Sequence, residues 1–153
     1  MRSWMALALL TVALGGCATQ GGGLSWAFGE DRQEGLKLVL GRPFTDNELI
    51  VALCQSRSGE VRLTLVGRPG DPAVIELHSG KLWQRYGGAG IGEDAESPGA
   101  LDIQCELSAD DPVLSRVADT GELTVVLGDR RMVLPNGFAQ VHDFITLCRA
   151  AGG

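Results

Sequence analysis

Short apolar segments separated by turn-forming residues constrain the fold of this chain more than any other feature. The segment from Glu60 to Val66 places Val61, Leu63 and Leu65 on one side and polar residues between them. This period of two is typical of a half-buried β-strand. Comparable segments recur between Gly, Pro, Asn and Asp clusters, and we expect further strands at 24–28, 35–40, 48–54, 73–77, 81–86, 100–107, 122–127 and 130–134.

Two segments depart from simple alternation. Glu48 to Cys54 is apolar almost throughout, which predicts a central strand buried on both faces and paired with 60–66 in a hairpin. Residues 87–99 are rich in Gly and acids, and we expect a loop there. Its glycines resemble a phosphate-binding loop only superficially, because acids and Pro98 follow where a helix would have to begin.

Two helices are expected late in the chain. Asp111 and Pro112 are typical of a helix start, and Gly121 of its end, so we predict a short helix near 112–119. A second helix is expected near 137–150, capped by Asn136. Its apolar residues recur at helical spacing and comprise Phe138, Val141, Ile145 and Cys148.

The fold class that follows is α+β and mainly β. The turns between strands are short and no crossover helices separate the early strands, which indicates antiparallel pairing in a β-sandwich or an open barrel. We expect one domain over residues 24–150. The many Gly and few aromatic residues agree with short strands joined by tight turns.

The N-terminus has the features of an export signal. Arg2 precedes the apolar run from Trp4 to Leu14, which is too short to span a membrane and ends in Leu14-Gly15-Gly16-Cys17. A cysteine at this point resembles the lipobox of bacterial lipoproteins. The resemblance implies removal of residues 1–16, a diacylglyceryl group on the Cys17 sulfur, and a fatty acid such as palmitate on the new amino terminus. Residues 17–23 then form the lipidated Cys and a flexible tether.

The same resemblance sets an expected location. Ala18 follows the lipidated cysteine, and in enterobacterial sorting an Asp there would favour the inner membrane. We therefore expect an outer-membrane lipoprotein that faces the periplasm, with the membrane as its first partner.

Three cysteines remain after Cys17. The periplasm is oxidising, so one pair is expected to form a disulfide and one thiol to stay free. We predict Cys54–Cys148, which would join an early strand to the final helix; Cys54–Cys105 is the alternative. Cys105 alternates in step with Ile103 and Leu107, as a buried thiol would.

The net charge and the spacing of cysteine and histidine residues exclude several classes of ligand. The net charge of −6 argues against nucleic acid as a ligand. The cysteine and histidine spacings predict no metal site, and no cofactor motif is present in the sequence. His78 beside Ser79 is the one pair that suggests nucleophilic catalysis, but the sequence lacks a nucleophile-elbow motif around this serine. We predict no catalytic residues. Trp83 and Tyr86, on opposite faces of one expected strand, are the candidate ligand contacts.

A weaker resemblance covers residues 24–148. The order of several short elements is similar to that of small exported bacterial proteins of uncharacterised function. These elements are Trp26-Ala27-Phe28, Leu40-Gly41-Arg42-Pro43 with Thr45-Asp46, the strand ending in Cys54, Asp111-Pro112, Thr120-Gly121, Leu134-Pro135 and the closing segment from Phe144 to Cys148. It brings no activity with it, and it supports the Cys54–Cys148 pairing.

Three functions follow as hypotheses. The first is a non-catalytic envelope domain that binds a protein or another envelope component. The second is an inhibitor or immunity-type lipoprotein whose acidic surface steers it to a basic, lysozyme-like cell-wall hydrolase. The third is a hydrolase that uses Ser79 or a carboxylate.

Overall fold

The computed structural model describes residues 23–93 and 101–149. The expectations for residues 1–16, for Cys17 and for most of the tether lie outside this part. The described elements are, in chain order, β1 (Ser25–Asp31), β2 (Gly35–Gly41), β3 (Glu48–Cys54), β4 (Glu60–Val66), β5 (Val74–Ser79), β6 (Leu82–Gly87), β7 (Ala89–Glu93), β8 (Leu101–Ser108), α1 (Pro112–Thr120), β9 (Thr124–Leu127), β10 (Arg130–Val133) and α2 (Phe138–Cys148).

The strands form two antiparallel sheets, which confirms the predicted fold class. A six-stranded sheet has the order β1-β2-β3-β4-β8-β7, and a four-stranded sheet has the order β10-β9-β5-β6. The inward side chains of both sheets meet in one apolar core. The expected hairpins β3–β4, β5–β6 and β9–β10 are all present.

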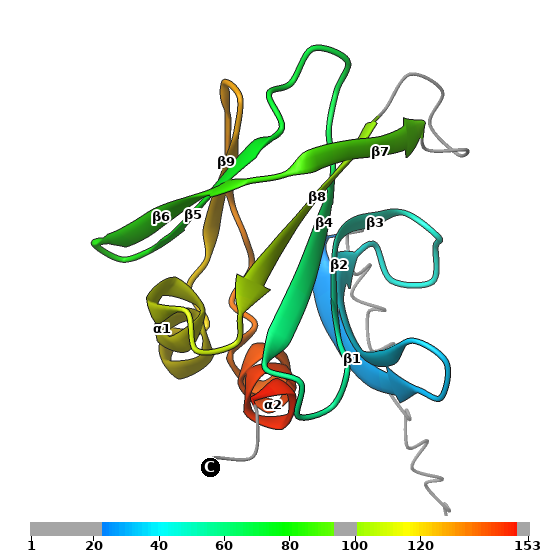
Figure 1. The fold of residues 1–153 in the computed structure, drawn as a ribbon, viewed down its shortest axis with the longest axis vertical. Helices are drawn as coiled ribbons and strands as arrows, with labels where there is room; N and C mark the ends of the chain where they lie inside the picture. Colours follow the sequence, from blue (N-terminus) through cyan, green and yellow to red (C-terminus); the bar gives the residue numbers. More distant parts are fainter. Residues whose placement is uncertain (1–22, 94–100, 150–153) are drawn as a thin grey trace, which may run out of the picture.

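One bent stretch of chain connects the sheets. β6 pairs with β5 in one sheet, and β7 pairs with β8 in the other, with Gly88 between them. Figure 1 shows β6 running on into β7 across the upper part of the molecule. The Gly88 N–H donates to the carbonyl oxygen of Ala73 at 2.8 Å. The fold is therefore closer to a partly closed barrel than to two separate layers.

The prediction of a loop over residues 87–99 was wrong for its first part. Residues 89–93 form β7, and residues 94–100 lie outside the described part. A Cβ atom on Gly88 would lie 2.6 Å from the carbonyl oxygen of Gln104, a distance that packed atoms do not tolerate. The glycine is thus required by a close approach of two strands, which composition alone does not distinguish from a turn.

A second correction concerns β3. Ile50, Ala52 and Cys54 are fully buried, but the side chains that alternate with them are only partly covered. The strand is therefore central in its sheet with one face in the core, and its other face is lined by half-buried apolar residues.

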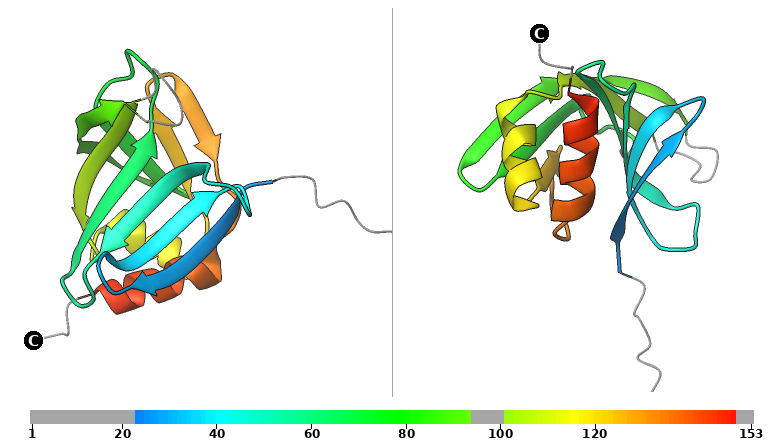
Figure 2. Two further views of the ribbon diagram at one scale, coloured as in Figure 1. Left: turned by 90° about the vertical axis from the view of Figure 1, so that its right-hand side faces the viewer. Right: turned by 90° about the horizontal axis from the view of Figure 1, so that it is seen from below.

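The two helices bridge the sheets. α2 packs on β1 and β2, α1 packs on β5 and β6, and the helices contact each other. Figure 2 shows them side by side between the two sheets. The Asp111 carboxylate caps α1 by accepting from the N–H groups of Val113 and Leu114, as predicted. The Asn136 side chain accepts from the Phe138 N–H, although the residue at the N-cap of α2 is Gly137.

Trp26 connects the edge strand β1 to the segment after β10. Its indole Nε1 donates to the carbonyl oxygen of Pro135 at 2.7 Å. A Cβ on Gly137 would lie 2.5 Å from the indole ring, so the ring packs directly on the backbone that leads into α2. Phe28, two residues along β1, meets Phe144 of α2 edge to face at 6.2 Å. These contacts close the side of the fold that the sheets leave open.

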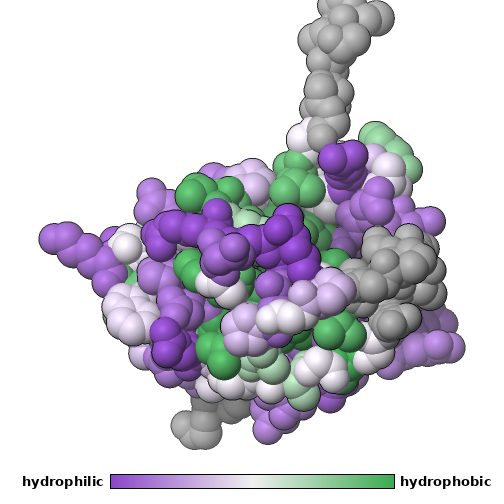
Figure 3. All heavy atoms as spheres, turned by 90° about the horizontal axis from the view of Figure 1, so that it is seen from above, coloured by the Kyte–Doolittle hydropathy of each residue, from purple (hydrophilic) through white to green (hydrophobic). Residues whose placement is uncertain are grey.

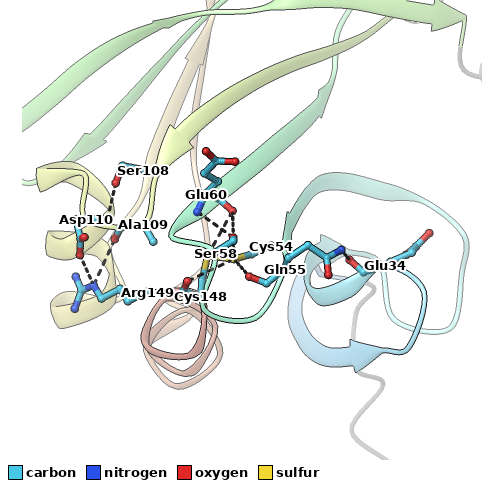
Figure 4. The surroundings of a disulfide bond; sticks show 10 residues. All are labelled: Glu34, Cys54, Gln55, Ser58, Glu60, Ser108, Ala109, Asp110, Cys148 and Arg149. Carbon is cyan, nitrogen blue, oxygen red and sulfur yellow. Dashed lines mark hydrogen bonds and ion pairs between the residues drawn. A yellow bond between two sulfur atoms is a disulfide. The ribbon is translucent and has the colours of Figure 1, made fainter. Parts of the chain in front are cut away.

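The structure contains the predicted Cys54–Cys148 disulfide, and the buried Cys105 is free. The bond joins the end of β3 to the end of α2 (Figure 4). Two backbone hydrogen bonds reinforce it, from Arg57 N to Leu147 O and from Gly59 N to Cys148 O. The cysteines are 94 residues apart, and a native bond that closes so long a loop contributes about 2–5 kcal/mol to stability.

Replacement of Gly88 tests whether the bend between β6 and β7 requires a glycine. We expect Gly88→Ala to lower the free energy of unfolding by about 1–3 kcal/mol, because its Cβ would overlap the Gln104 carbonyl. Urea unfolding followed by near-UV circular dichroism measures this. Gly87→Ala is the matched control, since its Cβ would have no atom within 4 Å. Equal stability of the two variants would contradict the close approach.

Candidate functional site

The outer face of the four-stranded sheet carries a group of cross-strand pairs. Along β5, Glu76 and His78 point outward, while Ile75, Leu77 and Ser79 are buried. The register places His78 opposite Trp83 and Glu76 opposite Arg85 on β6. We call these four residues the Trp83 face.

Trp83 is the exposed centre of this face. Its side chain is 56% exposed, and its indole stacks on the His78 imidazole with ring centroids 5.8 Å apart and planes inclined by 17°. An imidazole held against the indole restricts how the ring can turn. A flat apolar ring surface held in place is suited to stacking with a sugar ring or another planar group.

Glu76 and Arg85 supply polar groups next to the indole. The Arg85 guanidinium donates to the Glu76 carboxylate, with Nε 2.9 Å from Oε1. The His78 Nε2 lies 3.3 Å from the other carboxylate oxygen. Arg85 and then His78 hold the pKa of Glu76 below its usual value, so the carboxylate stays ionised and can accept hydrogen bonds.

Two shallow grooves flank the Trp83 face. One, of about 250 Å³, is lined by Glu76 and Arg85 together with Val74 and Val126. The other, of about 330 Å³, is lined by His78 and by residues of β9 and β10 and their neighbours. On the side of the molecule in Figure 3, hydrophobic side chains lie scattered among hydrophilic ones. Open grooves of this kind fit an extended polymer better than an enclosed small molecule.

Tyr86 is not part of this surface, which corrects its prediction as a ligand contact. Its side chain is 8% exposed and belongs to the core. Burial, together with the nearby Asp111 carboxylate, raises the pKa of Tyr86 far above its usual value. The prediction that Trp83 and Tyr86 point to opposite faces of the strand is confirmed.

The structure does not bring Ser79 and His78 together as a nucleophile and base. Ser79 is 1% exposed, and its hydroxyl lies 3.4 Å from the Thr120 hydroxyl on the inner side of the sheet. His78 is on the outer side with Glu76 and Trp83. His142 is also separate, with Nδ1 3.2 Å from the carbonyl oxygen of Ala118.

Sequence reasoning did not single out Glu76 and Arg85. Both are ordinary charged residues in alternating strands, and the signal that joins them is the register of the β5–β6 hairpin. Within residues 23–93 and 101–149, neither helix is long and apolar enough to cross a membrane. Comparison of the chain with protein-family models, curated proteins and solved structures finds no match.

An ion pair fixes the strand ends beside the smaller groove. Asp71 Oδ2 accepts from the Arg68 N–H at 2.7 Å and from the Arg130 guanidinium. Partial burial disfavours the charged carboxylate, but the Arg68 amide and Arg130 outweigh it, and the pKa of Asp71 is lowered. The pair joins the turn before β5 to β10.

Replacement of Asp71 should therefore have a pH-dependent effect. We expect Asp71→Asn to reduce stability at neutral pH by about 1–3 kcal/mol, because Arg130 keeps its burial but loses its charged partner. A carboxyl with a lowered folded-state pKa stabilises fully above its unfolded value of 3.8 and loses that contribution as pH falls through the folded value. Urea midpoints of wild type and variant should thus converge below pH 3.8. Asp129→Asn, at an exposed neighbour, is the control and should change little. A constant difference at all pH values would contradict this role.

Proposed function

We propose that this chain is a non-catalytic bacterial envelope lipoprotein that binds a cell-wall glycan through the Trp83 face. The observation that carries the binding role is the exposed indole of Trp83, which is stacked on His78 and placed beside the charged pair Glu76–Arg85. An indole face contributes stacking, and a carboxylate beside a guanidinium offers an acceptor and donors for sugar hydroxyls.

The anchor is proposed from the lipobox-like Leu14-Gly15-Gly16-Cys17. A diacylglyceryl group together with an amino-terminal acyl chain gives stable attachment, because each buried methylene contributes about 0.8 kcal/mol. Anchoring in the outer membrane would expose the domain to the periplasm and its cell-wall polymer. β5 and β6, which carry the Trp83 face, lie on the opposite side of the fold from β1, so an anchor before β1 would leave this hairpin accessible (Figure 1).

A second candidate function is inhibition of a lysozyme-like hydrolase. The net charge of −6 favours encounter with a basic enzyme by electrostatic steering. The Trp83 face itself carries Arg85 paired with Glu76, so its charge is mixed and the steering argument for a cationic protein does not apply to this face.

Sedimentation with insoluble peptidoglycan tests the glycan proposal. We expect the purified chain to co-sediment, and Trp83→Ala to reduce its affinity about tenfold or more, as loss of a central aromatic contact commonly does. Phe44→Ala is a matched control, because it removes another exposed aromatic side chain, from the β2–β3 loop of the other sheet. Undiminished binding by Trp83→Ala would remove the Trp83 face from the proposal. Saturable inhibition of a lysozyme without sedimentation would favour the second candidate.

Substitution of Cys17 tests the anchor separately. We expect Cys17→Ser to move the protein from the membrane fraction of the producing cell to the soluble fraction, because the hydroxyl cannot take the thioether-linked lipid. Fractionation with immunoblotting, and mass spectrometry of the N-terminal peptide, measure this. A Cys17→Ser protein that still partitions with membranes would exclude the lipid anchor. Cys105→Ala is the control and should remain membrane-bound, since that thiol is buried in the core.

A further inference from the structure

The loop between β2 and β3 presents the most exposed large apolar side chain of the described residues. Phe44 is 105% exposed relative to its reference state, so it touches almost nothing in the domain. Its backbone φ of 63° is in the left-handed region, which non-glycine residues seldom occupy. The phenyl ring gains no burial within the described domain and its backbone conformation costs energy, so the loop is a candidate for a contact outside the domain.

Hydrogen bonds within the loop hold Phe44 in this position. The Thr45 N–H and hydroxyl both donate to the Arg42 carbonyl oxygen, at 3.3 and 2.9 Å. The Arg42 N–H donates to the Asn47 carbonyl oxygen at 3.2 Å. The loop is therefore a compact turn with Phe44 at its tip, and not a loose excursion of chain.

The loop lies at the end of the sheet where the tether joins. Ser25, the first residue of β1, pairs with Gly41, the last residue of β2. Figure 2 shows the start of β1 beside the β2–β3 connection. A groove of about 800 Å³ at this end is lined by Leu24 and the loop, and by half-buried apolar residues of β3 and β4.

The length of the tether limits how far the β2–β3 loop can lie from a lipid on Cys17. Six residues separate Cys17 from Leu24, and the seven Cα–Cα steps between these two residues span at most about 25 Å even when fully extended. A lipid on Cys17 would therefore keep the β2–β3 loop close to the bilayer surface at a high effective concentration. Under that condition one aromatic side chain is enough to orient the domain, although it would not bind a free protein to lipid.

From these observations we infer that the β2–β3 loop is a membrane contact, with Phe44 inserted at the boundary between headgroups and acyl chains. A phenyl ring can bury its apolar surface at this boundary, and the neighbouring exposed Arg42 can reach lipid phosphates. Asp46 and Glu48 oppose deep insertion near anionic lipid, and Glu48 is partly neutralised by Lys37 at 3.3 Å. The contact is thus shallow. This inference rests on the proposed lipid anchor.

Site-specific fluorescence with the full lipoprotein tests the contact. The lipidated chain is reconstituted in vesicles of phosphatidylethanolamine and phosphatidylglycerol that contain a lipid with a nitroxide on its headgroup. A dye is attached at Asp46→Cys, two residues from Phe44, or at Arg32→Cys in the β1–β2 turn at the other end of the strands. The native Cys105 does not compete for the dye, because it is 3% exposed and burial raises its pKa to about 11.

We expect quenching at position 46 to be several-fold stronger than at position 32. Phe44→Asn should remove most of this difference, because Asn accepts the left-handed backbone but has no apolar ring to insert. Gln84→Asn, at an exposed position of β6 outside this groove, is a matched control that leaves the loop intact.

Each contrary result overturns a defined statement. Vesicles that retain the lipoprotein while positions 46 and 32 are quenched equally would overturn the loop contact and leave the anchor standing. Retention with unchanged quenching in Phe44→Asn would exclude Phe44 as the inserted residue. If the lipoprotein does not stay with vesicles at all, the anchor fails, and the loop contact fails with it.

Discussion

The close approach of Gly88 to the Gln104 carbonyl is the constraint on which the rest of the fold depends. It allows a single stretch of chain to pair with β5 on one side of the bend and with β8 on the other. Both sheets thereby face the same core, and the helices have one space to fill. Without that bend, each sheet would need a separate covering layer to bury its apolar face.

The outer surfaces of the two sheets also carry different features. The four-stranded sheet turns Trp83 and its paired neighbours away from the core, whereas the six-stranded sheet carries the tether and the Phe44 loop. If the domain is anchored and binds a glycan as proposed, its ligand surface has to stay clear of the bilayer. The sheet topology already places the Trp83 face and the Phe44 loop on different sheets.

Side-chain periodicity was sufficient to predict most elements, and it failed where contacts are distant in sequence. The alternation of Glu60–Val66 and the Asp111-Pro112 start of α1 are local signals, and both predictions are confirmed. Glycines near Gly88 indicate a turn locally, because their close strand neighbour is far along the chain. Spacing placed Trp83 and Tyr86 on opposite faces, but only the packing of α1 against β6 decides that Tyr86 is buried. The Glu76–Arg85 pair required strand register, which the sequence does not provide.

The disulfide has a consequence for the order in which the chain can mature. Cys54, Cys105 and Cys148 lie in that order along the chain, so Cys54 and Cys105 are both synthesised before Cys148 is available. Until then the Cys54 thiol can encounter Cys105 first. In the folded domain Cys105 is buried in β8, paired with β4, and Cys54 is joined to Cys148, so burial keeps the third thiol away from the disulfide.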